Sequence, residues 1–217
     1  VMAEAEACRE PDPAELEGRL DLRSKTLFTI DPADAADHDD AVGIERLDSG
    51  WRLTVSIADV SHYVRPGSAL DEEARRRTTS AYFPGRAVHM LPEPLAAGAA
   101  SLLPDRDRLA MSAVIDLDAD GRMVSATFAK SVIRSCARLS YQEAQAILDE
   151  PGKHELGRAL MMMQGCARGL RQRRMDRGAI DLELSEAAVE LDPKGRPIAM
   201  KRVERLMSHR IIEECML

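Results

Sequence analysis

Five aspartates fall within ten residues of this 217-residue sequence, with an apolar run on each side of them. The run 26–30 ends where the aspartates begin, and the apolar residues 41–44 follow the last of them. This order indicates an acidic turn at the end of a strand, inside a folded domain rather than in a tail, and Pro32 fixes the turn. The five residues are Asp31, Asp34, Asp37, Asp39 and Asp40.

Carboxylates at this density point to a bound cation. Like charges held close together raise their own pKa values unless a cation or a proton lies among them. The segment has no cysteine and no cluster of histidines, so its oxygen ligands suit Mg²⁺ or Mn²⁺ better than zinc. The ligand spacing, central glycine and closing glutamate of a calcium-binding loop are missing. The first interpretation is metal-assisted phosphate chemistry, and its alternative is a solvated acidic loop.

The overall charge limits the kinds of partner. The formal net charge is −7, which argues against a free-standing nucleic-acid binder, because such a protein needs a basic face. A nuclease is still allowed, since metal ions and further segments can meet the phosphates. Hydrophobic residues make up 45% of the chain, which is enough for the core of one large domain or two small ones.

The cysteines and the hydropathy favour a cytoplasmic protein without a membrane partner. No apolar run is long enough to span a bilayer, and the acidic residues 1–6 are unlike a signal peptide. The cysteines lack zinc-site spacing, and disulfides are rare in the cytosol. These cysteines are Cys8, Cys136, Cys166 and Cys215.

Alternating apolar residues around turn signals predict three β-hairpins, at residues 42–57, 109–133 and 188–200. Helical patterns cover residues 70–79, 140–148, 154–175 and the segment from 203 onward. Residues 1–20 are rich in Ala, Glu and Pro, and we expect a linker or a frayed helix there. The predicted fold class is mixed α/β (α+β), a largely antiparallel, hairpin-built sheet with packed helices, over residues 21–217.

Several side chains have both a structural and a functional interpretation. Tyr82 lies in an aromatic loop with a Pro-Gly turn that could stack on a base, although packing is the commoner role. His62 follows a strand pattern and is expected to be structural. His209 and Glu213 lie four apart on one helix face, a spacing that can hold zinc, but the third ligand of such a motif is missing.

Motifs that occur in a fixed order along residues 22–217 give a more specific indication. They are Thr29–Asp31, Asp37–Val42, Ile57–Val64, Tyr82–Gly85, Met90–Pro92, Asp107–Ser112, Arg177–Asp181 and His209–Met216. Together they resemble the catalytic domain of the ribonuclease II / ribonuclease R (RNB) family of exoribonucleases, of which this chain would be the N-terminal portion. The resemblance implies 3′-to-5′ hydrolysis of single-stranded RNA to nucleoside 5′-monophosphates by a mechanism with two Mg²⁺ ions.

The resemblance also assigns roles to residues and leaves Asp34 outside the metal site. The implied metal ligands are Asp31, Asp37, Asp39 and Asp40. Among them Asp39 is the catalytic residue whose loss is expected to do the most damage. Tyr82 matches an aromatic residue that stacks on the terminal base. Tyr141 and Glu213 match positions near the ribose, whose 2′-hydroxyl distinguishes RNA from DNA.

The sequence departs from the family pattern at two places and covers only part of it. Leu182 stands where a phenylalanine usually forms the second side of the base clamp, and His38 replaces an apolar residue. The second half of the catalytic domain and the OB-type RNA-binding domains would lie outside this sequence. One alternative is therefore a catalytically impaired member with an RNA-binding or protein-interaction role, and another is a hydrolase of small phosphate esters.

Overall fold

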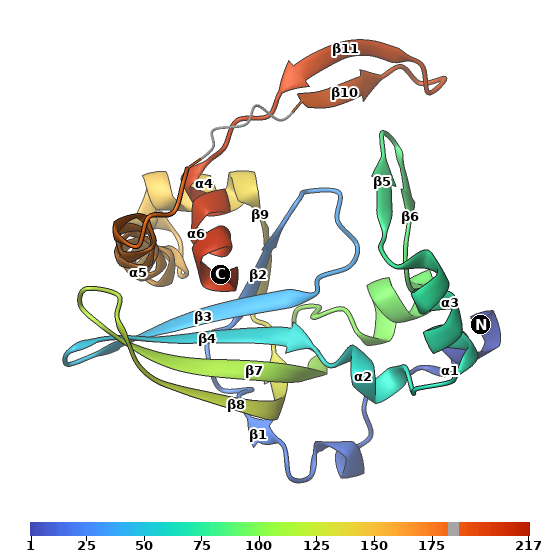
Figure 1. Cartoon of the computed structure of the whole chain (residues 1–217), viewed down its shortest axis with the longest axis horizontal. Helices are drawn as coiled ribbons and strands as arrows, with labels where there is room; N and C mark the ends of the chain where they lie inside the picture. The colour runs from blue at the N-terminus through green and yellow to red at the C-terminus, as the bar shows by residue number, and fades with distance from the viewer. Residues whose placement is uncertain (182–186) are drawn as a thin grey trace.

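The computed structural model describes residues 1–181 and 187–217, without the side chain of Ala188. In these residues a mixed seven-stranded sheet forms the body, and two small hairpins extend away from it (Figure 1). The strand order is β1-β8-β7-β4-β3-β2-β9, with parallel pairs only at β1–β8 and β2–β9. The strands of this sheet are β1 Leu20–Asp21, β2 Phe28–Asp31, β3 Asp40–Leu47, β4 Gly50–Ala58, β7 Asp107–Asp118, β8 Met123–Arg134 and β9 Ala137–Ser140.

Helices pack on this sheet, and the predicted mixed α/β class is confirmed. The α-helices are α1 Met2–Ala7, α2 Val60–Tyr63, α3 Ala69–Arg77, α4 Tyr141–Asp149, α5 Gly157–Asp176 and α6 Met207–Met216. Shorter segments are the 3₁₀ turns η1 Pro13–Leu16 and η3 Pro151–Lys153 and the π-helical turn η2 Pro94–Ala99. No helix in the described parts of the chain has the length and apolar character that crossing a bilayer requires.

The hairpins follow the predicted pattern with one addition. The predicted pairs are β3–β4, β7–β8 and β10–β11, the last with bounds Ala187–Leu191 and Pro197–Arg202. The aromatic segment predicted as a loop forms a further hairpin, β5 Ala81–Phe83 and β6 Arg86–Val88. Gly85 adopts a positive φ of 71°, which only glycine accepts easily, and this closes the two-residue turn.

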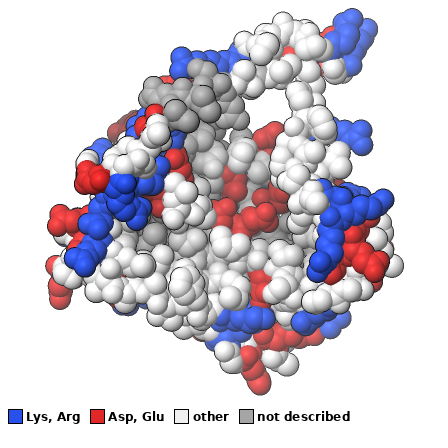
Figure 2. Space-filling model, in the orientation of Figure 1, with Lys and Arg blue, Asp and Glu red and all other residues white. Residues whose placement is uncertain are grey.

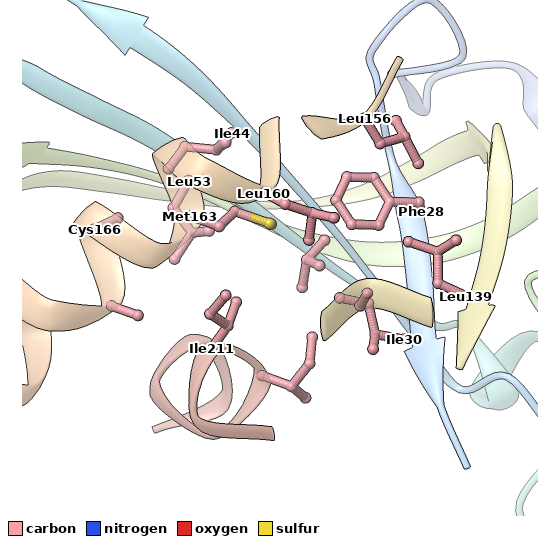
Figure 3. Close-up of a cluster of buried hydrophobic side chains, with 14 of the residues drawn as sticks. Phe28, Ile30, Ile44, Leu53, Leu139, Leu156, Leu160, Met163, Cys166 and Ile211 are labelled. Atoms are coloured by element: carbon pink, nitrogen blue, oxygen red, sulfur yellow. The ribbon is translucent and has the colours of Figure 1, made fainter. Parts of the chain in front are cut away.

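A hydrophobic core lies between the sheet and helices α4, α5 and α6 (Figure 3). Phe28 and Ile30 of β2 enter it from the sheet, while Leu160 and Met163 of α5 and Ile211 of α6 enter it from the helices. All five side chains are almost completely buried. This packing holds the C-terminal helices against the strand that leads into the acidic segment.

A second core includes Leu95 of η2 and Leu70 of α3. Successive side chains along a strand point to opposite faces, so Ala41 enters this second core whereas the next residue, Val42, enters the first. The start of β3 is therefore held from both sides of the sheet. This is the point at which the acidic segment ends.

The N-terminal residues also pack onto the body. The composition of residues 1–20 favours a linker or a frayed helix, yet Ala5 of α1 is fully buried because its small side chain fits into the second core. The carboxylate of Glu4 accepts hydrogen bonds from the backbone N–H groups of Ala69 and Leu70. Negative charge is favourable at that position because the first N–H groups of α3 lack partners within the helix.

Candidate active site

The acidic segment connects two neighbouring strands of the sheet. β2 ends at Asp31 and β3 begins at Asp40, so the connecting loop leaves and re-enters the sheet at the same edge. Asp31 is in register with Ser140 of the parallel strand β9. At the other end the backbone N–H of Ala58 donates to the carbonyl of Asp39 at 2.9 Å. Both ends of the predicted acidic turn are thereby fixed by strand pairing.

His38 anchors the middle of this loop. Its side chain is buried, and its Nδ1 lies 2.7 Å from Oδ2 of Asp31. Its backbone N–H donates to Oγ of Ser101 at 3.0 Å, and its carbonyl accepts from the N–H of Leu102 at 2.8 Å. Sequence reasoning identified His38 only as a departure from the family pattern, because Ser101 and Leu102, which hold its backbone, lie more than 60 residues away along the chain.

The four implied metal ligands line one cavity of about 520 Å³. Its other lining residues come from the same loop and from the β5–β6 hairpin, and they are Pro32, Asp34, Ala35, Ala36, Tyr82, Phe83, Gly85, Arg86, Ala87 and His89. On the face shown in Figure 2, acidic side chains gather on the floor of a hollow beside that hairpin. The fold thus concentrates negative charge inside a recess.

The carboxylates are close enough to change one another's ionisation. Burial, and then the charges of Asp31 and Asp39, raise the pKa of Asp40 to about 6. The pKa of Asp39 is also raised, first by burial and then by Asp37 and Asp31. A group of carboxylates that resists full ionisation by itself has the electrostatic character that a divalent cation relieves.

The donor set of this cavity fits a hard divalent cation, since it consists of carboxylate oxygens. Among the residues that the structure describes, no three Asp, Glu, His or Cys side chains are close enough together to count as a complete metal-binding group. Mg²⁺ keeps several waters and shares its remaining positions with substrate phosphates, so it does not require a closed protein cage. The assignment of the four aspartates as ligands stays a prediction.

The β5–β6 hairpin supplies an aromatic wall of the cavity. Tyr82 and Phe83 are 69% and 60% exposed, so the packing interpretation of Tyr82 is wrong. The Tyr82 hydroxyl donates to Oδ2 of Asp37 at 3.4 Å, and Nδ1 of His89 lies 3.3 Å from the same oxygen. Sequence reasoning missed His89, whose only local signal is its place directly after β6. Leu182, the expected second side of the clamp, lies outside the described residues.

Tyr141 lies beside the acidic pocket at the first residue of α4. Its pKa is raised by burial and then by the carboxylates of Asp40 and Asp31, which places its ring within their electrostatic reach. The ring stacks on His209 of α6, with centroids 4.0 Å apart and an interplanar angle of 13°. The stacking joins two helices next to the acidic cavity, and a ribose contact by Tyr141 stays a prediction.

Glu213 lies one turn beyond His209 and does not line the acidic cavity. Its carboxylate pairs with the guanidinium groups of Arg205 and Arg174. Nδ1 of His209 accepts a hydrogen bond from the backbone N–H of Leu206 at the start of the helix. Both members of the disfavoured zinc pair therefore have other partners. A ribose contact by Glu213 stays a prediction.

The fold and the pocket define the class of domain. It is an α/β domain with an acidic recess at the end of a strand, and the carboxylate oxygens in this recess suit a divalent cation. Its helices, sheet and recess occupy one continuous chain segment. The chain belongs to the RNB domain family, whose model matches residues 19–217. The predicted family is thereby confirmed.

The similar proteins are longer than this chain. Ribonuclease R of Aquifex aeolicus (strain VF5) is 45% identical over 100% of this chain and 32% of that protein. Ribonuclease R of Vibrio parahaemolyticus is 42% identical over 95% of this chain and 25% of that protein. The structure of Mycoplasma genitalium RNase R in complex with ribose methylated single-stranded RNA gives a TM-score of 0.89 at 31% identity, over 95% of this chain and 33% of that one. This chain thus spans about a third or less of each.

Proposed function

We propose that this chain forms part of the catalytic domain of a 3′-to-5′ exoribonuclease that hydrolyses single-stranded RNA to nucleoside 5′-monophosphates with Mg²⁺, or with Mn²⁺ in its place. The observation that carries the proposal is the pocket in which Asp31, Asp37, Asp39 and Asp40 come together, in a chain of the RNB domain family. The relatives named ribonuclease R and the RNA-bound solved structure support it.

In this proposal the four aspartates would hold two divalent cations, and these would supply an activated water and neutralise charge on the scissile phosphate. Asp39 is exposed and lines the pocket, where its carboxylate can orient groups at the phosphate. The exposed ring of Tyr82 forms the wall on which the terminal base stacks. Tyr141 and Glu213 serve the ribose, and Glu213 does so with its carboxylate already held by arginines.

Tyr82→Ala is expected to weaken the binding of single-stranded RNA by about tenfold, because stacking on an aromatic ring contributes about 1–3 kcal/mol per base. Fluorescence anisotropy of the full-length protein with a 3′-ended oligonucleotide, in chelator to prevent cleavage, measures the loss. Tyr82→Phe keeps the ring and removes only the hydroxyl that reaches Asp37, so it should bind almost as tightly as the unaltered protein. Equal weakening by both variants would rule out stacking as the role of Tyr82.

Mg²⁺ is expected to stabilise the protein more at about pH 7.5 than at about pH 5. The pKa of Asp40 is raised in the folded, metal-free state, so its ionised carboxylate lowers the stability of the fold. This cost is removed as the pH falls through about 6 toward the ordinary pKa of an aspartate, and it returns as the pH rises. A bound cation favours the ionised carboxylate, so Mg²⁺ should stabilise the fold most at the higher pH, where the ionised form is costly without metal. Thermal unfolding in Mg²⁺ and in chelator at both pH values measures the difference, and Asp40→Asn should reduce it. Equal stabilisation at both pH values would contradict this expectation.

The full-length protein encoded by the complete gene should shorten single-stranded RNA from its 3′ end in Mg²⁺ and stop in chelator. Gel analysis of 5′-labelled RNA gives the direction, and chromatography of the products should show nucleoside 5′-monophosphates. Internal cuts or 3′-phosphate products would contradict the proposal. We expect the 217-residue chain alone to be a poor enzyme, since the ribonuclease R relatives are about three to four times as long. Robust processive degradation by this chain would contradict that expectation.

The alternative of an impaired, non-catalytic member is not favoured, because all four aspartates that the resemblance assigns are present and line one pocket. A hydrolase of small phosphate esters has no observation in its favour, whereas the exposed aromatic wall suits a nucleic-acid base.

The proposal includes a second half of the catalytic domain and OB-type domains as partners. It also includes a cytoplasmic location.

A further inference from the structure

The contact between His38 and Asp31 uses one nitrogen of a completely enclosed ring. His38 is 1% exposed, and its Nδ1 lies 2.7 Å from Oδ2 of Asp31. An ionised carboxylate can only accept hydrogen bonds, so a bond to it requires the proton to be on Nδ1. That bond occupies one oxygen of Asp31 and leaves Oδ1 as its other acceptor.

The second ring nitrogen, Nε2, is buried and has no hydrogen-bond partner among the described residues. His38 also lines a smaller cavity of about 130 Å³, separate from the acidic pocket, together with Pro32, Ala33, Leu139 and the polar side chains of Arg138, Ser140 and Glu143. A buried acceptor without a partner is costly, and a polar cavity of this size has room for water. A water that donates to Nε2 would satisfy it.

The backbone holds the ring where these contacts require it. The N–H and carbonyl of His38 are bonded to Ser101 and Leu102, and Oγ of Ser101 also donates to the carbonyl of Ala36 at 3.4 Å. Ser101 is completely buried. The backbone from which the imidazole extends is therefore held by Ser101 and Leu102, and the ring itself contacts Asp31.

We propose that His38 is a positioning residue for the metal site, with its Nδ1–H fixing Oδ2 of Asp31 so that Asp31 presents Oδ1 to a divalent cation. A water in the small cavity donates to Nε2 and holds the ring in this tautomer. Groups that hydrogen-bond to metal ligands orient them, and their loss typically weakens metal binding about 10- to 100-fold. This inference rests on the proposed function, in that it takes Asp31 as a ligand.

Mn²⁺ binding to the 217-residue chain, measured by calorimetry or by loss of the free Mn²⁺ signal in electron paramagnetic resonance, tests the inference. His38→Phe, which removes both nitrogens, should weaken Mn²⁺ binding by about 10- to 100-fold. His38→Asn, whose amide can donate from near the position of Nδ1, should restore binding to within a few-fold of the unaltered chain. His62→Phe is the matched control, because His62 pairs with Glu15 at 2.9 Å outside the acidic pocket.

A second readout does not depend on metal. In the ¹⁵N-labelled, metal-free chain, the imidazole nitrogen shifts of His38 should show a protonated Nδ1 and an unprotonated Nε2. The opposite tautomer would overturn the inference, even if His38→Phe failed to fold. Unchanged Mn²⁺ binding by a folded His38→Phe chain would overturn the positioning role alone. Failure of the unaltered chain to bind Mn²⁺ would overturn the metal assignment in the proposed function and the positioning role with it.

Discussion

Asp39→Asn is expected to lower RNA cleavage by the full-length protein by about a thousandfold or more, while RNA binding in chelator stays within a few-fold of the unaltered protein. Asparagine keeps the size of the side chain and removes its charge. The acidic pocket then loses one of the carboxylates that would hold cations against the phosphate, and metal-assisted stabilisation of that kind contributes several kcal/mol to the rate. Single-turnover cleavage and anisotropy measured on the same preparation separate the two effects.

Two further substitutions make this test specific. Asp48→Asn carries the same chemical change at an exposed turn between β3 and β4, outside the acidic pocket, and should leave cleavage unchanged. Asp34→Asn lies in the acidic loop but outside the implied metal ligands, so it should cost less than Asp39→Asn. Equal cleavage by the Asp39→Asn and unaltered proteins would show that the site is wrongly assigned.

Arg19→Met should destabilise the fold by about 3 kcal/mol, or roughly 6–12 °C in unfolding temperature. The guanidinium of Arg19 lies 2.8 Å from Oδ2 of Asp59, and the two side chains are 7% and 0% exposed. Burial acts to raise the pKa of Asp59, but hydrogen bonds from Ser61 and Arg19 bring it below its usual value. Methionine would leave a buried carboxylate without its main partner, and Nζ of Lys130, 3.8 Å from the same oxygen, compensates only in part.

Thermal and denaturant unfolding of the 217-residue chain measure this cost. Arg9→Met is the matched control, because Arg9 pairs with Asp12 at 2.9 Å while both side chains are mostly exposed, and such surface pairs contribute little. We expect the control to unfold within about 1 °C of the unaltered chain. If Arg19→Met behaved like Arg9→Met, the N-terminal segment would not be tied to the sheet by this pair.

The local features of the fold could be predicted from the sequence. Alternation around turn residues identified β3–β4 and β7–β8, because the signal and the partner strand lie next to each other in the chain. The capping residues Ser140 and Glu143 marked the start of α4 in the same way. The acidic segment was predicted at a strand end because the apolar runs on both sides of it are local.

The missed features depend on residues far apart in the chain. The parallel pairs β1–β8 and β2–β9 join strands separated by about a hundred residues, and no turn signal marks them. Separations of 63 and 39 residues likewise hide the bond between His38 and Ser101 and the pairing of Glu213 with Arg174. His89 reaches Asp37 only because the aromatic segment folds back as a hairpin. The sequence therefore predicted which residues form the site, but the contacts among them could be known only from the folded structure.

The parallel pairing of β2 with β9 makes the pocket sensitive to changes in chain length. Asp31 is opposite Ser140, and one residue further on Tyr141 begins the helix beside the pocket. Side chains alternate along a strand, so a slip of one residue in β9 would turn its side chains to the opposite face, while β2 stays held by β3 and by the core contacts of Phe28 and Ile30. An insertion within residues 137–140 would therefore shift Tyr141 relative to Asp31, whereas one at the exposed residues 33 and 34 would lengthen the acidic loop without changing this pairing.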